Sequence, residues 1–185
     1  NVKRMLAYSS IGHTGFALIA IAAFSPESIT SLLFYLAVYA IANIGALMLA
    51  SYFANTVGAE NVEDYRGLGF RLPAASVCFV IILISLTGLP VTAGFIGKLI
   101  VFKSAYGVYQ FNHSSWLLWL IITGAVTTVV SLFYYIKIPL YLFLKKGENN
   151  RELTFSNQFL LFVVIIIAFF LILVGVFPDL LTKYL

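Results

Sequence analysis

The stretch Gly88-Leu89-Pro90-Val91-Thr92-Ala93-Gly94 interrupts an apolar window that runs from residue 73 to about residue 107. Pro90 removes a backbone donor and clashes with the preceding turn, while Gly88 and Gly94 permit dihedral angles that other residues avoid. We therefore expect the helix to break near Gly88. The window is long for one straight crossing of a membrane, and a discontinuous helix accounts for the excess length.

The composition is that of an integral membrane protein, because 62% of the residues are hydrophobic and only 10% are charged. Several apolar windows can each supply the ~20 helical residues that cross ~30 Å of hydrocarbon. We predict an all-α, polytopic membrane helix bundle that forms a single transmembrane domain over residues 1–185. Its five expected membrane helices cover about residues 5–24, 31–54, 73–107, 115–144 and 157–177.

The chain begins with Asn1 rather than methionine, and its first apolar window follows Lys3 and Arg4 almost at once. These features predict that the chain is a fragment of a longer protein. Cys78 is the only cysteine and cannot form an internal disulfide or a multi-cysteine metal site. We expect neither a metal nor a cofactor in this chain, and its dispersed basic residues do not indicate a nucleic-acid partner.

Basic residues in the connections predict the orientation, because Lys and Arg concentrate on the cytoplasmic side of short loops. If five helices alternate, the opposite side carries Lys183 and, at a helix end, Lys103. The longer polar connection between the second and third windows is expected to hold a short helical turn around Glu60 to Tyr65. The residues predicted to face the cytoplasm are Lys3, Arg4, Arg66, Arg71, Lys145, Lys146 and Arg151.

Lys98 needs a functional explanation, because a lysine near the centre of a membrane helix costs roughly 2.5 to 3.5 kcal/mol on insertion scales. It lies ~15 Å from the outer end of its window near Tyr106, at 1.5 Å per residue. Unpaired carbonyls at the break would stabilise its charge, whereas desolvation opposes it, so we predict that Lys98 gains and loses a proton. The alternatives are a stem that snorkels to the headgroups and a buried amine that never titrates.

His13 is the second candidate, because it lies about 15 Å from Lys3 and hence near the middle of the first window. It belongs to a polar seam with Tyr8 and Ser9, in which Ser9 and His13 share one helix face. An imidazole can accept and donate a proton, which predicts a relay with Ser9 and Tyr8 as further members. The alternative is a histidine that only packs against a neighbouring helix. For Lys137, snorkelling and a relay role both stay open.

Two motifs resemble signatures of the antiporter-like subunits of respiratory complex I, NADH:quinone oxidoreductase. The first is Asn1-Val2-Lys3-Arg4-Met5-Leu6-Ala7-Tyr8-Ser9-Ser10-Ile11-Gly12-His13-Thr14-Gly15, and the second runs from Gly88 through Phe95-Ile96-Gly97 to Lys98. The resemblance covers essentially the whole chain and is greatest to the N-type subunit, chain 2 in mitochondrial naming. The related M-type subunit usually has glutamate at the position of Lys98. Some relatives carry a second proline where this chain has Val91.

The resemblance implies the carboxy-terminal helices of a fourteen-helix, proton-translocating subunit in the bacterial inner membrane. Lys98 would then be the titrating residue of an outward-leading half-channel, and His13 a member of the central hydrophilic axis. NADH, FMN, iron–sulfur clusters and quinone would belong to other subunits. The implied partners are neighbouring antiporter-like subunits, the missing helices of the same subunit and the bilayer. The alternatives are a subunit of a multisubunit cation/proton antiporter and a structural scaffold in which Lys98 does not titrate.

Overall fold

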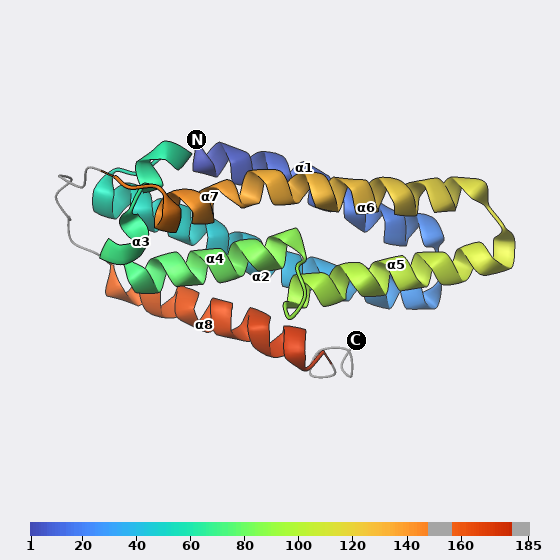
Figure 1. Cartoon of the computed structure of the whole chain (residues 1–185). Helices are drawn as coiled ribbons and strands as arrows, with labels where there is room; N and C mark the ends of the chain where they lie inside the picture. The colour runs from blue at the N-terminus through green and yellow to red at the C-terminus, as the bar shows by residue number, and fades with distance from the viewer. Residues whose placement is uncertain (148–156, 179–185) are drawn as a thin grey trace.

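The computed structural model describes residues 1–147 and 157–178, which form an elongated bundle of helices (Figure 1). No strand occurs in these described residues, so the predicted all-α class is confirmed. The elements, in chain order, are α1 Val2–Ala23, α2 Pro26–Val57, the 3-10 turn η1 Val62–Tyr65, α3 Leu68–Arg71, α4 Pro73–Thr87, α5 Ala93–Asn112, α6 Ser115–Tyr135, α7 Lys137–Pro139, the π-helical turn η2 Leu140–Leu144 and α8 Gln158–Val176.

Four segments of the described chain are long and apolar enough to cross a membrane: α1, α2, the run Ser115–Leu144 and α8. The predicted third crossing is divided by its break, and α4 alone, at 15 residues, is too short to span. Figure 1 shows α4 and α5 lying end to end, with the break between them. The two half-helices therefore occupy the place of the third predicted crossing.

The break lies where the sequence predicts it, and its unwound segment is residues 88–92. Gly88 ends α4 with a φ of 80°. Val91 has a φ of 73°, which is an unfavourable conformation for a β-branched residue. The Thr92 hydroxyl donates to the Leu89 carbonyl oxygen at 2.7 Å and closes the loop before α5 begins.

Gly94 has a different role from the one predicted, because it lies in the first turn of α5 and not in the unwound segment. A Cβ at this position would collide with the backbone carbonyl of Ser85, one helix away. The Gly94 amide donates to the Ser85 hydroxyl at 3.2 Å. Gly94 thus allows the first turn of α5 to pack against the last turn of α4.

Helix α2 begins earlier than its apolar window, because a capping box starts it at Pro26. The Ser28 amide donates to the Ser25 hydroxyl at 3.1 Å, and the Ser25 amide donates to the Ser28 hydroxyl at 2.7 Å. The polar first turn lies outside the predicted span 31–54 because hydropathy alone does not register a cap. The predicted turn near Glu60 to Tyr65 is present as η1.

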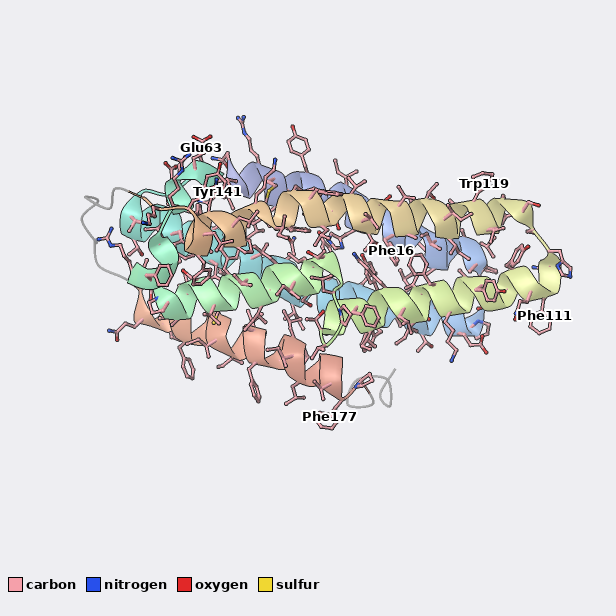
Figure 2. The ribbon with its side chains drawn as sticks, in the orientation of Figure 1. Phe16, Glu63, Phe111, Trp119, Tyr141 and Phe177 are labelled. Carbon is pink, nitrogen blue, oxygen red and sulfur yellow. The ribbon has the colours of Figure 1, made fainter. Side chains whose placement is uncertain are left out.

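One end of the bundle gathers the connections that carry the basic residues. The Val2 amide donates to the Glu60 carbonyl at 2.9 Å, and the Gly67 amide donates to the Tyr141 carbonyl at 3.1 Å. Glu63 and Phe111 lie at opposite ends of the molecule (Figure 2). The common side predicted for these loops is consistent with this arrangement, whereas the cytoplasmic assignment stays a prediction. Arg151 and Lys183 lie outside the described residues.

Replacing Gly94 with alanine should destabilise the bundle at the break. The added methyl group would meet the Ser85 carbonyl, and such overpacking typically costs about 1–3 kcal/mol. Gly107→Ala is the matched control, because Gly107 also lies in α5 and a methyl group added there would meet nothing within 4 Å. Thermal unfolding of the full-length protein in detergent would measure both variants. Equal melting temperatures for the two variants would contradict the close approach.

Candidate proton-transfer site

Lys98 is held by the end of the broken helix. Its amine donates to the Thr87 carbonyl oxygen at 2.8 Å and to the Leu86 carbonyl oxygen at 3.4 Å. These carbonyls lie in the last turn of α4, where the chain leaves the helix and the next amides no longer reach them. The negative end of the α4 dipole therefore faces the amine, as the sequence predicts. Within the described residues, the hydrogen-bond partners of the amine are backbone carbonyls and not carboxylates.

Gly88 leaves the space that the Lys98 stem occupies. A Cβ at Gly88 would lie 2.8 Å from Lys98 Cδ and 3.3 Å from the amine nitrogen. The positive φ of Gly88 is itself unfavourable for other residues. The same glycine thus ends α4 and admits the lysine, which explains why the break and the amine occur together.

The amine lies far from both ends of the bundle. Helix α4 provides 15 residues, or ~22 Å, on one side, and α5 continues beyond its predicted end to Asn112 on the other. The Lys98 amine lies over the ring of Phe16, 5.6 Å from its centre. Figure 2 shows Phe16 about midway between the labelled residues of the two ends. Only 7% of Lys98 is exposed, so snorkelling to a surface does not describe this side chain.

His13, on α1, is surrounded by tyrosine side chains from α2 and α6. Its Nδ1 is 2.8 Å from the Tyr35 hydroxyl, and its Nε2 is 3.5 Å from the Tyr135 hydroxyl. The imidazole also stacks on Tyr39, with ring centres 4.4 Å apart. Only 7% of His13 is exposed. Both ring nitrogens thus face phenol groups from neighbouring helices.

A small cavity joins Lys98 to His13. Its volume is about 20 Å³, which is enough for one water molecule. A second void also borders both residues and is lined by residues of α2, α4 and α5. A proton could pass between the amine and the imidazole through such a water. The residues that line the first cavity are Ser9, Gly12, His13, Phe16, Tyr35, Lys98, Thr127, Thr128, Ser131 and Tyr134.

The structure brings together some of the predicted site residues and separates others. Ser9 is buried, lines the cavity and donates to the Leu6 carbonyl at 2.6 Å. Tyr8 is 72% exposed and does not line it. Lys137 is exposed in α7 and also lies outside the cavity lining. The relay roles of these three residues stay predictions. Of the three, only Ser9 lines the cavity with His13 and Lys98.

Sequence reasoning missed the tyrosines that surround His13. Tyr35 and Tyr39 are four residues apart on α2, a spacing that places both on one helix face. Tyr135 is adjacent to Tyr134 near the end of α6. The i, i+4 pair of tyrosines in a membrane helix was an available signal, because a buried phenol needs a hydrogen-bond partner.

The family match covers most of the chain. The model for the family described as NADH:quinone oxidoreductase/Mrp antiporter, TM matches residues 1–131. The chain is 42% identical to NADH-quinone oxidoreductase subunit N 2 of Chloroherpeton thalassium, over 92% of this chain and 33% of that protein. It is 41% identical to subunit N of Chlorobium chlorochromatii, over 85% of this chain and 30% of that protein. The chain thus spans about a third of the length of these curated relatives.

Solved structures share this arrangement of helices. A chain of respiratory complex I from Thermus thermophilus with bound aureothin superposes with a TM-score of 0.79 and 28% identity, over 98% of this chain and 39% of that one. A chain of the Mrp complex from Dietzia sp. DQ12-45-1b superposes with a TM-score of 0.82 over 96% of this chain and 40% of that one. At 17% identity, the second likeness concerns the fold alone.

The motif around His13 and the whole broken helix with Lys98 fall within the matched residues, as does most of α6. The superposed chains agree with the course of the helices. This chain belongs to the family of antiporter-like transmembrane subunits shared by NADH:quinone oxidoreductase and Mrp antiporters.

Proposed function

We propose that this chain is part of a proton-translocating membrane-arm subunit of NADH:quinone oxidoreductase and that Lys98 is its titrating residue. The observation that supports the proposal best is the contact of the buried Lys98 amine with the Thr87 and Leu86 carbonyls. Carbonyl dipoles can hold an ammonium group without a fixed counter-charge. A lysine held in this way can lose its proton without leaving an unpaired carboxylate behind.

His13 is the proposed partner of Lys98 in the transfer. The two side chains border the same voids, and a water between them would provide a hydrogen-bonded path. A positive charge on both groups at once is unfavourable because like charges repel strongly away from bulk water. A proton is therefore expected to occupy one of the two at a time. Charge changes in adjacent subunits would shift the balance between them.

The subunit-N relatives favour the quinone oxidoreductase over the antiporter alternative, because they match more than four fifths of this chain at 41–42% identity. In this proposal NADH, FMN, iron–sulfur clusters and quinone are bound by other subunits. The basic end of the bundle would face the cytoplasm of a bacterium, and the other end would face outwards. Proton transfer that needs NADH oxidation would support this assignment, and transfer driven by a sodium gradient alone would support the antiporter.

Replacing Lys98 with methionine in the full-length protein should abolish proton transfer through this subunit. Methionine keeps an unbranched stem for packing but cannot bind a proton. Loss of a positioned proton-transfer group typically costs 10²-fold or more in rate. We expect a fall of roughly that size in the flux through this path. NADH-driven proton uptake in proteoliposomes of the assembled complex would measure it.

Lys103→Met is the matched control for that experiment. Lys103 lies on the same helix five residues later and is exposed. Its replacement removes the same charge without touching the α4 carbonyls, so proton transfer should be retained. Undiminished transfer in the Lys98 variant, with normal assembly, would show that Lys98 has a structural role only.

Replacing His13 with glutamine separates a relay from a packing role. Glutamine has a similar volume and can still hydrogen-bond to Tyr35 and Tyr135, but it cannot be protonated near neutral pH. We expect normal assembly and a proton-transfer rate reduced by roughly 10²-fold. Full proton transfer in this variant would assign His13 to packing alone. The same proteoliposome assay of the complex provides the rate.

A further inference from the structure

Tyr35 contacts His13 and the residue that precedes Lys98. Its hydroxyl lies 2.8 Å from His13 Nδ1, and its ring packs against Gly97, one residue before Lys98. A Cβ at Gly97 would lie 3.2 Å from Tyr35 Cδ2, so the absence of a side chain there leaves room for the phenol ring. Tyr35, on α2, is 2% exposed and packs against Phe16 of α1 and Gly97 of α5. Its hydroxyl therefore has a defined position relative to the imidazole.

The available donors and acceptors indicate the direction of the bond between Tyr35 and His13. In residues 1–147 and 157–178, the Tyr35 hydroxyl has a hydrogen bond to His13 and to no other protein group. A phenol carries one proton, which is satisfied within the protein when the hydroxyl donates to Nδ1. If Nδ1–H donated instead, the phenol proton would have no acceptor among the described protein groups and would depend on a water in the adjoining cavity.

The environment of the second ring nitrogen, Nε2, is consistent with donation from Tyr35 to Nδ1. When Nδ1 accepts from Tyr35, the neutral ring carries its proton on Nε2. Nε2 faces the Tyr135 hydroxyl at 3.5 Å, a longer contact whose oxygen can accept. The shorter bond at Nδ1 therefore dominates the choice of tautomer. Tyr39 contacts the imidazole by stacking, so it holds the plane of the ring and leaves the tautomer to Tyr35.

We propose that Tyr35 is the positioning residue of His13, which its hydroxyl holds in the Nε2–H tautomer by donating to Nδ1. This inference deepens the relay proposed above and rests on it for its role in transport. A proton that binds at Nδ1 requires the Tyr35 hydroxyl to turn away, and loss of the Nε2 proton then leaves the Nδ1–H tautomer. The Tyr35 hydroxyl disfavours the Nδ1–H tautomer, because it donates to an unprotonated Nδ1. Tyr35 thus favours the return of the imidazole to the Nε2–H tautomer, a return in which the Nδ1 proton leaves and another proton binds at Nε2.

Nitrogen-15 NMR of histidine-labelled, full-length protein in membranes tests the tautomer directly. The His13 signals are assigned by their absence from the His13→Gln spectrum. In the unmodified protein we expect an unprotonated Nδ1 and a proton on Nε2. Tyr35→Phe should reduce the tautomer preference about fivefold, which corresponds to the loss of one ordinary hydrogen bond, and signals of a protonated Nδ1 should appear.

Tyr39→Phe is the matched control, because it removes a phenol oxygen from the same helix face and keeps the stacked ring. It should leave the tautomer ratio unchanged. A proton on Nδ1 in the unmodified protein, or an unchanged ratio in Tyr35→Phe, would overturn the inference. The first of these results needs no variant to fold. If Lys98→Met left proton transfer intact while the Tyr35 result held, the proposed function would fail and the positioning role would stand.

Discussion

The contact between the Lys98 amine and the last carbonyls of α4 is the interaction on which the site depends. A continuous helix could not provide it, because its carbonyls would be bonded to the amides of the next turn. The break thus creates the acceptors that allow a cation to lie so far from the ends of the bundle. The break also leaves an unwound backbone, which includes a valine at positive φ. Neighbouring helices must hold this strained segment in place.

Close packing maintains that unwound segment. Gly94 lets α5 approach the Ser85 carbonyl, and Gly175 of α8 lies directly against the backbone of Val91 and Thr92. Helix α8 runs beside α4 and ends near the break (Figure 1). Its role in the site is therefore indirect: it contributes no group to the cavity but confines the loop that positions the carbonyls. An almost wholly apolar transmembrane segment can matter to the proposed proton path in this way.

Sequence reasoning identified the features that depend on local chemistry. Pro90 and Gly88 predicted the break, and the apolar windows predicted the main helices, because proline geometry and membrane thickness act on short stretches. Gly94 and the tyrosines around His13 were not assigned correctly, because their roles depend on which helices become neighbours. Likewise, Tyr8 and Ser9 are adjacent in the sequence, yet only Ser9 lines the cavity, and one residue of helix rotation separates the two outcomes.

The two sides of the cavity differ in the contacts that hold their side chains, and this difference bears on which group would move in the proposed transfer. His13 is confined by a stacked ring and by phenols at both nitrogens. Lys98 has four methylene groups and its amine contacts carbonyls and a ring face. An ammonium that loses its proton loses most of its attraction to those carbonyls, so the neutral stem is free to turn towards the cavity. In the proposed relay, the imidazole would therefore keep its position, and the flexible lysine would change its hydrogen-bond partners as it gains and loses a proton.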